Sequence, residues 1–211
     1  MDGFHNKVLH VDLNRKSFEE ESVADEVYIT LLGGKGLGTC LLLNNTRARV
    51  EPLSEDNVLI FATGPAADTM VWGSSRYGVF TKSPLTGLYS ESYAGGRVAE
   101  PISRAGYDAV VIKGASKKPV YLEITNEDVR FHDASHIWGK DTYESEDIIR
   151  REVGVKDAGI VVIGPAGENL VRFAVIENDY WRSAGRTGAG AVMGSKKIKG
   201  IAFHGNKEKR V

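Results

Sequence analysis

This chain of 211 residues contains a single cysteine, Cys40, so it can form neither an intramolecular disulfide framework nor a CxxC metal site. It has no run of about 18 apolar residues. Its first residues also lack the basic segment and apolar core of a signal peptide. We therefore expect a soluble, unexported, cytoplasmic protein with no membrane partner.

An excess of charge of either sign is also missing, since 27 Lys and Arg residues oppose 28 Asp and Glu residues. A chain with this balance has no global field that would attract nucleic acid. We expect no nucleic-acid partner, and any anionic ligand should be bound by a local site. The 42% hydrophobic content is enough for one large domain or two small domains with a real core.

The common nucleotide-binding and catalytic motifs are missing too. After Gly188 and Gly190 the next glycine is Gly194, one position too late for GxGxxG, and GAVMGSKK lacks the GK[ST] ending of a phosphate loop. No serine lies in a GxSxG elbow, and the HxxxH pair that begins at His132 would bind a metal only in a helix. We therefore expect no catalytic residue in this chain.

Short strand patterns make up most of what is present. After a hairpin predicted at the N-terminus around 7–13, further strands are predicted at 57–64, 76–83, 87–92, 108–114, 119–125, 128–133, 158–165, 169–177 and 198–205. Helices are predicted within 27–45, interrupted by glycines, and at 96–105, 142–153 and after residue 190. Strands that adjoin one another in sequence favour an α+β fold with mixed sheets over a doubly wound parallel sheet.

One pattern resembles an internal repeat. In each half a strand ends in Gly-Pro-Ala, at 64–66 and 164–166, and an arginine follows, Arg76 or Arg182. Glycines then open a helix, and a last strand ends the half as DAVVIKGASKK or KGIAFHGNKEK. Duplication into two pseudo-symmetric halves would explain this pattern, and so would coincidence among 24 glycines.

The stretch WRSAGRTGAG (181–190) combines two arginines with three glycines. A helix that opens with glycines presents unpaired N–H groups to an anion, and guanidinium groups bind phosphate oxygens bidentately. Arg76, Arg97 and Arg104 lie around the corresponding opening of the first half. A weak surface salt bridge explains each arginine singly. Together they predict a site for an anionic ligand that carries the chemistry itself.

The motifs, taken in order, resemble a known family. TGPAADT (63–69), RYGVFTKSPLTG (76–87), AGG (94–96), AGYDAVVIKG (105–114), KPVYL (118–122), DASHIWGK (133–140), IGPAGENLV (163–171) and AGRTGAGAVMGSKK (184–197) are similar to the N-terminal domain of the aldehyde ferredoxin oxidoreductases, the tungstopterin enzymes. The resemblance covers nearly all of 1–211. It implies one α+β domain with two β-sheets, on which a tungsten ion held by two pterins sits, with magnesium shared by the pterin phosphates.

The resemblance also implies residue roles. Arg76 and Arg182 would contact the pterins or their phosphates, Gly95 would let the backbone approach the ligand, and the carbonyls of Tyr93 and Ser183 would meet the magnesium. The other implied cofactor-binding residues are Gly96, Ala184 and Gly185. The family pattern implies asparagine at 93 and alanine at 183, so Tyr93 and Ser183 depart from it and weaken aldehyde as the substrate.

For the assembled enzyme the resemblance implies oxidation of aldehydes to carboxylic acids, with ferredoxin as the acceptor and tungsten, or molybdenum in its place, at the centre. The family's iron-sulfur cluster lies in further domains. We therefore expect this chain alone to be inactive and to need those cluster-binding domains or a partner subunit. A noncatalytic pterin-binding module or scaffold, and a related tungstoenzyme acting on an acyl thioester, are the alternatives. An uncovered cofactor face would favour homo-oligomers.

Overall fold

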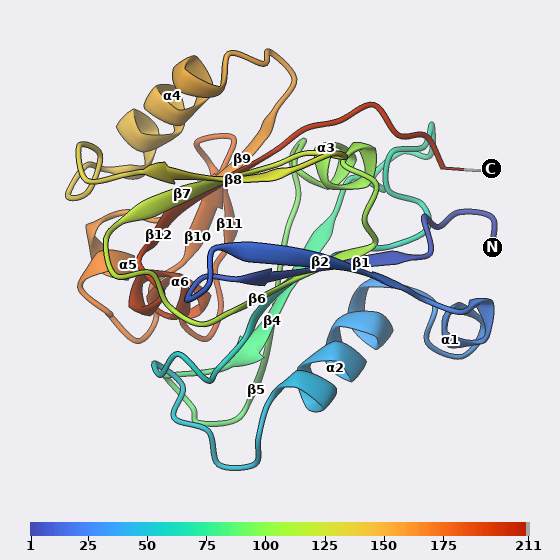
Figure 1. Cartoon of the computed structure of the whole chain (residues 1–211), viewed down its shortest axis with the longest axis horizontal. Coiled ribbons are helices and arrows are strands. Elements are labelled where there is room, and N and C mark those ends of the chain that lie inside the picture. The colour runs from blue at the N-terminus through green and yellow to red at the C-terminus, as the bar shows by residue number, and fades with distance from the viewer. Residues whose placement is uncertain (210–211) are drawn as a thin grey trace.

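The computed structural model describes residues 1–209, which form two six-stranded sheets and six helices (Figure 1). The first sheet has the order β2-β1-β6-β3-β4-β5 and consists of β1 (Lys7–Asp12), β2 (Ser17–Ser22), β3 (Leu59–Thr63), β4 (Tyr77–Lys82), β5 (Tyr89–Ala94) and β6 (Ala109–Lys113). The second has the order β11-β10-β9-β12-β7-β8 and consists of β7 (Val120–Ile124), β8 (Val129–Asp133), β9 (Gly159–Val162), β10 (Ile176–Asn178), β11 (Arg182–Ala184) and β12 (Ile198–Phe203). The helices are α1 (Asp25–Leu31), α2 (Gly34–Asn45), α3 (Ala99–Arg104), α4 (Thr142–Val153), α5 (Pro165–Glu168) and α6 (Ala189–Ser195).

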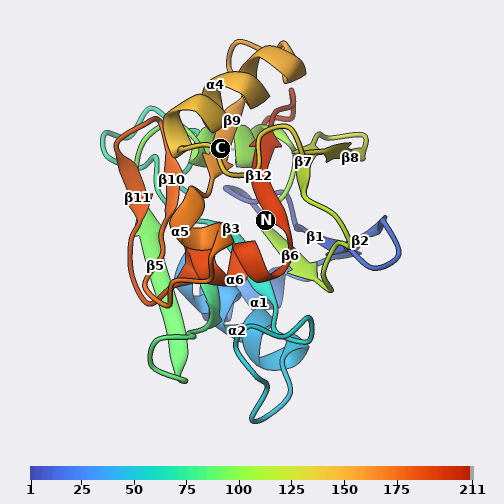
Figure 2. The same cartoon turned by 90° about the vertical axis from the view of Figure 1, so that its left-hand side faces the viewer.

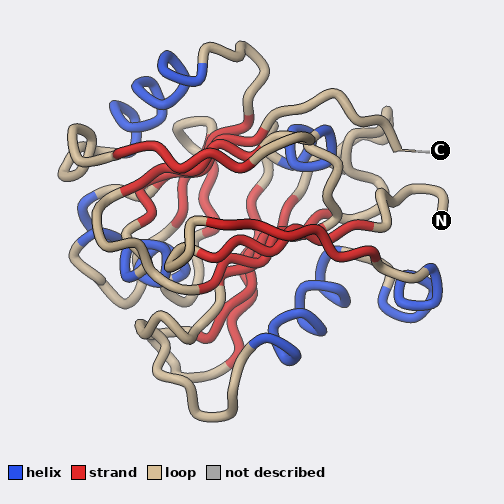
Figure 3. Tube along the Cα trace, viewed as in Figure 1, coloured by secondary structure: helices blue, strands red, loops and turns tan. Residues whose placement is uncertain are grey.

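The sheets lie in the middle of the molecule with helices outside them (Figure 3). Leu9 and Phe61 of the first sheet share one buried core with Leu122 and Phe203 of the second. A second core lies between the first sheet and α1 and α2, and a third lies between the second sheet and α4. The predicted α+β class with mixed sheets is therefore confirmed.

The second sheet repeats the first. Numbered within its own half of the chain, each sheet has the strand order 2-1-6-3-4-5. In each sheet only the first and last strands of the half pair in parallel. Helices α2 and α4 each precede the third strand of their half, and α3 and α6 each precede the last. Duplication, not coincidence, therefore explains the repeated Gly-Pro-Ala segments.

Helix α4 shows local sequence deciding structure. The Asp141 side chain accepts a hydrogen bond from the N–H of Glu144 at 2.8 Å, which caps the start of the helix. At the other end Gly154 takes a left-handed conformation with φ of 70° and bonds back to Arg150. These two signals fix the predicted bounds of 142–153.

The strand predicted over 169–177 is wrong for most of its length. Helix α5 ends at Glu168, residues 169–175 form turns and irregular backbone, and only β10, at the end of the predicted range, is a strand. The backbone N–H groups of Leu170, Val171 and Ala174 bond to carbonyls three to five positions earlier, so they form turns. The segment also packs closely against α6, since a Cβ on Gly190 would lie 2.2 Å from the carbonyl oxygen of Val175. The N–H of Gly190 also donates a hydrogen bond to the carbonyl of Ala174 at 3.0 Å, so that carbonyl is not available to a neighbouring strand.

No single helix among residues 1–209 is long and apolar enough to span a membrane. Helices α1 and α2 meet that test of length and composition only as a pair, and they are bent by 112° at their junction.

Candidate functional site

The two edge strands β5 and β11 bring together the segments that the sequence singled out. Each ends its sheet at the same side of the molecule, and the two strands lie against each other (Figure 2). The strands end at Ala94 and Ala184, and the following helices begin at Ala99 and Ala189. This equal spacing makes Tyr93 the counterpart of Ser183 in the duplicated halves.

Arg76 lies beside the glycines that follow β5. A Cβ built on Gly95 would be 3.8 Å from the guanidinium group of Arg76, which is exposed. The segment before β4 is held there because the hydroxyl of Ser75 donates to the carbonyl of Gly96 at 2.5 Å. The first half thus places a guanidinium group next to backbone that carries no side chain.

Arg182 lies in β11, the strand of the second half that packs against β5. It pairs across the β10–β11 hairpin with Asn178, so the two side chains emerge on one face. Asn178 is fully buried and donates from its amide nitrogen to the carbonyl of Gly95 at 3.0 Å. The exposed Arg182 therefore leaves β11 on the face that is directed at Gly95. Arg76 and Arg182 form no ion pair within residues 1–209, which leaves both available to an anion.

A glycine in the left-handed conformation fixes the junction between the end of β5 and the β10–β11 turn. Gly96 has φ of +93°, and a Cβ there would lie 2.1 Å from Oδ2 of Asp179. That carboxylate accepts the N–H of Arg97 at 2.7 Å. Asp179 and Tyr180 are themselves left-handed, at φ of 46° and 62°. The turn is held because the Tyr180 hydroxyl donates to Asp147 at 2.6 Å.

The side chains of Tyr93 and Ser183 do not point at the junction. The Tyr93 hydroxyl donates to Glu91 at 3.3 Å, and burial together with that carboxylate raises the pKa of Tyr93 to about 12. The Ser183 hydroxyl donates to Glu177 at 2.8 Å, and burial raises the pKa of Glu177. The methyl group of Ala184 is in the core. A ligand at this edge would therefore meet these residues through their peptide groups.

The hypothesis of open helix starts is wrong for α6. A Cβ on Gly188 would lie 2.1 Å from the carbonyl oxygen of Arg172, and α6 is buried from Ala189 to Gly194. These glycines therefore serve close packing, and their surroundings are protein. Arg104 is also engaged, since its guanidinium group binds Asp68 at 2.7 Å. The site that remains is the paired strand edge with Arg76, Gly95, Gly96 and Arg182.

Sequence reasoning missed the groups that hold this edge together. Asn178 and Asp179 bind backbone more than 80 positions away, at Gly95 and Arg97. Ser92 accepts the N–H of Arg186 at 3.0 Å and anchors the loop after β11. Only the predicted repeat could have indicated these pairs, because it places the ends of β5 and β11 at equivalent positions.

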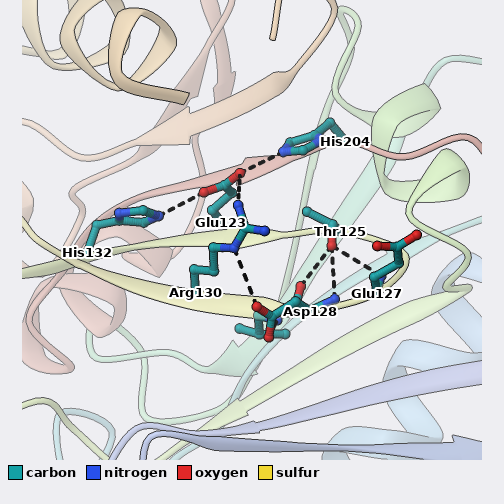
Figure 4. A network of polar contacts seen from close by, with 8 residues as sticks. Glu123, Thr125, Glu127, Asp128, Arg130, His132 and His204 are labelled. Atoms are coloured by element: carbon teal, nitrogen blue, oxygen red, sulfur yellow. Dashed lines mark hydrogen bonds and ion pairs between the residues drawn. The ribbon is translucent and has the colours of Figure 1, made fainter. Parts of the chain in front are cut away.

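A second polar cluster lies on β7, β8 and the end of β12 (Figure 4), and β7 and β8 are at the opposite end of the second sheet from β11. Buried Glu123 accepts hydrogen bonds from the ring nitrogens of His132 at 2.8 Å and His204 at 2.9 Å, and Arg130 approaches at 3.4 Å. Burial alone would raise the pKa of Glu123, but the two histidines and Arg130 together lower it. No group of three or more His, Cys, Asp or Glu residues within 1–209 is arranged to hold a metal ion.

The double sheet with paired edge strands defines a class of domain found in a solved enzyme complex. The chain superimposes with a TM-score of 0.95 and 39% identity on a chain of the active site complex of benzoyl coenzyme A reductase with 1,5-dienoyl-CoA, covering 99% of this chain and 32% of that one.

The sequence identifies the family. The model of the aldehyde ferredoxin oxidoreductase N-terminal domain matches residues 8–205. A tungsten-containing aldehyde ferredoxin oxidoreductase of Pyrococcus furiosus is 46% identical over 98% of this chain and 34% of its own length. The WOR-like subunit of an aliphatic sulfonate oxidoreductase from the same organism is 35% identical over 98% of this chain and 35% of its own length. The chain belongs to the aldehyde ferredoxin oxidoreductase family and spans about a third of the length of these relatives.

Proposed function

We propose that this chain forms the binding surface, or seat, of a tungsten cofactor held by two pterins, in an enzyme that oxidises aldehydes to carboxylic acids. The observation that supports the proposal is that Arg76 lies beside Gly95, and that Gly95 is bound by Asn178, the cross-strand partner of Arg182, in a family with tungsten-containing members. The duplicated halves offer two equivalent strand ends, which suits a ligand that itself contains two similar parts.

The residues at the edge fit such a group. Two guanidinium groups without carboxylate partners in 1–209 match phosphate oxygens. Gly95 and Gly185 let a ligand approach the backbone, and the carbonyls of Tyr93 and Ser183 could bind magnesium between two phosphates. When bound, tungsten would supply the two-electron oxidation. The chain's own residues would orient the pterins and balance their charge.

Electron transfer would belong to the rest of the enzyme. A chain with one cysteine cannot ligate a four-cysteine iron-sulfur cluster, so the cluster and the contact with ferredoxin would be supplied by further domains or by a partner subunit. The cytoplasmic location expected from the single cysteine also stays a prediction.

A different substrate is the alternative that a specific observation favours. The structural relative at 39% identity is part of an enzyme complex that holds a dienoyl-CoA. The same seat could therefore serve a tungstoenzyme acting on an acyl thioester. A noncatalytic pterin-binding module is the other alternative, and it requires only the strand edge.

Metal and pterin content test the seat directly. In the enzyme assembled with its remaining domains or subunit, Arg182→Glu should lower bound tungsten and oxidised-pterin fluorescence at least tenfold, because a carboxylate would repel the phosphates. Arg151→Glu, on the exposed side of α4, makes the same charge change and should retain both. Unchanged tungsten content in Arg182→Glu would remove Arg182 from the site. Relative rates with an aldehyde and an acyl-CoA would then distinguish the two substrate classes.

A further inference from the structure

A cavity of about 450 Å³ and another of about 790 Å³ lie at equivalent places in the two halves. The larger one is formed by the β1–β2 turn, including Asn14 to Lys16, and by the linker Ala115 to Pro119 between the halves. Strands β1 and β2 end the first sheet opposite β5, and β7 and β8 end the second opposite β11. The larger cavity, the linker cavity, therefore lies on the far side of both sheets from the strand edge described above.

The linker cavity is lined by four basic side chains, Arg15, Lys16, Lys117 and Lys118. All four are exposed, and within residues 1–209 the only carboxylate contact of the set is Arg15 with Asp12 at 4.0 Å. The lining contains two acidic residues, Glu55 and Asp133, so its four basic residues outnumber its acidic ones. The cavity therefore keeps an excess of positive charge in a chain whose net charge is −1.

The duplicated half provides an internal comparison. In the linker cavity the Asn14 side chain accepts the N–H of Ala115 at 3.0 Å. In the smaller cavity Asn126, in the β7–β8 turn, accepts the N–H of Asn206 at 3.3 Å, after β12. The fold thus contains the same contact twice, between the turn of the first hairpin of a half and the segment that follows its last strand, and this is called the turn-to-linker contact.

The charges of the two cavities have diverged. The smaller cavity contains Glu127 and Asp157, and its arginines are neutralised, Arg104 by Asp68 and Arg130 by Glu123. Since the scaffold forms there without unpaired cations, the four basic side chains of the linker cavity are not required by the fold. Their presence points to a ligand.

The walls of the linker cavity indicate the ligand's character. Val120 and the partly buried Phe131 supply apolar surface beside the cations. Behind the linker, the buried ammonium group of Lys196 donates to the carbonyl of Gly114 at 2.9 Å. A volume of about 790 Å³ lies in the range that encloses small organic molecules.

We propose that the linker cavity binds a small anion that carries two or more linked phosphates, held by Arg15, Lys16, Lys117 and Lys118. Free polyphosphate and a nucleotide share this chemistry, and the nucleotide would add stacking of its base on Phe131. The site is independent of the tungsten seat, since the two lie at opposite edges of the sheets.

Titration calorimetry of the intact protein at low salt tests this with tripolyphosphate, ADP and ATP as probes. Saturable binding is expected, weakened at least tenfold when both Lys117→Gln and Lys118→Gln are present. The matched variant with Arg151→Gln and Lys156→Gln removes the same charge from exposed positions outside the cavity and should bind normally.

The probes separate the two sources. Equal affinity for tripolyphosphate and ATP would show a site for the phosphates alone, and tighter ATP binding that is lost in Phe131→Ala would show a nucleotide site. Thermal melting confirms that each variant is folded. The proposal is overturned if none of the three probes binds saturably, or if both double variants lose binding equally.

Discussion

At the scale of single residues, the junction between the end of β5 and the β10–β11 turn requires glycine at position 96, because a side chain there would clash. Gly96 combines a left-handed backbone with direct contact to Asp179 from the other half of the chain. Such a conformation is costly for any residue with a Cβ. One residue therefore sets both the direction of the chain after β5 and the distance between the halves.

Substitution of this residue should cost stability. In Gly96→Ala the left-handed conformation costs about 1–2 kcal/mol, and the clash with Asp179 adds about 1–3 kcal/mol. We expect the free energy of unfolding in urea to fall by roughly 2–5 kcal/mol. Gly87→Ala is the control, because Gly87 has φ of +70° with no atom within 4 Å of the added Cβ, and it should cost about 1 kcal/mol. Equal losses would show that the contact with Asp179 contributes nothing.

Single residues also mark the limit of sequence-based prediction for the site. Arg76, Gly95 and Arg182 could be nominated, because arginine beside glycine is a local pattern with a chemical meaning. Asn178 could not, since nothing around it indicates that its partners are Tyr77 and the carbonyl of Gly95, 101 and 83 positions away. Gly188 was misread because a glycine needed for close packing looks the same in sequence as one that admits a ligand.

At the scale of elements, the β10–β11 hairpin is fastened to the first sheet by one buried amide. Asn178 accepts the hydroxyl of Tyr77 at 2.8 Å while it donates to the carbonyl of Gly95. Burial raises the pKa of Tyr77, so the tyrosine stays a neutral donor. Because Tyr77 and Asn178 are buried away from water, each depends on the other for its hydrogen bond.

Removal of that amide should destabilise the protein. Asn178→Ala leaves the buried hydroxyl of Tyr77 and the partly buried carbonyl of Gly95 without this partner, and we expect a loss of about 2–4 kcal/mol in the free energy of unfolding. Asn44→Ala, at an exposed position of α2, should change it by less than about 0.5 kcal/mol. In the double variant Asn178→Ala and Tyr77→Phe, the loss of free energy of unfolding should be about 1 kcal/mol smaller than the sum of the losses in the two single variants. Strict additivity would mean that the amide and the hydroxyl act separately.

The cluster that joins β7, β8 and the end of β12 should make stability depend on acid. Burial opposes ionisation of Glu123, but hydrogen bonds from His204 and His132 and the charge of Arg130 outweigh it, so the pKa is lowered on folding. A lowered folded pKa gives stability that is present above the unfolded value near 4.3 and is lost as pH falls through the folded value.

Thermal melting across pH tests this cluster. The difference in melting temperature between the natural protein and Glu123→Gln should be larger at pH 5 than at pH 3, because protonation of the natural carboxylate as the pH falls removes its advantage over the neutral amide. Glu19→Gln, an exposed residue of β2, should show a small difference that does not change with pH. A difference for Glu123→Gln that grows toward pH 3 would contradict the assigned sign.

Elements were predictable where their signals are local. The caps of α4 and the turn of the β1–β2 hairpin are determined by residues that are adjacent in the sequence. Strand β11 was missed because its three residues, Arg182–Ala184, are too few for a periodic pattern. Its pairing with β10 depends on a turn of left-handed Asp179 and Tyr180, residues that sequence alone does not mark as a turn.

At the scale of the whole molecule, duplication explains both ends of the structure. The repeated strand order brings two equivalent edges together at β5 and β11, where a ligand with two similar parts would fit. At the opposite edges the two turn-to-linker contacts are retained while their charges differ. Strand and turn patterns could predict the repeat, but the stacking of the sheets depends on the shared core and is visible only in three dimensions.

The molecule also exposes large apolar side chains next to the proposed seat. Met70 and Trp72 are 97% and 99% exposed on the segment that leads to Arg76, and Trp181, beside Arg182, is 75% exposed. Relatives are about three times as long as this chain, so in them further protein is available to cover such residues. Without that cover, apolar surface favours association between copies.

Sedimentation of the chain alone should therefore show an average mass that rises with concentration. The double variant Met70→Ser and Trp72→Ser should shift this association to at least tenfold higher concentration, because it removes two apolar side chains that are almost fully exposed. Leu43→Ser is the control, since Leu43 is 72% exposed but lies on α2, away from Arg76 and Arg182. A chain that stays monomeric at high concentration would show that this surface does not self-associate. An equal shift in Leu43→Ser would show that contacts elsewhere on the molecule drive the association.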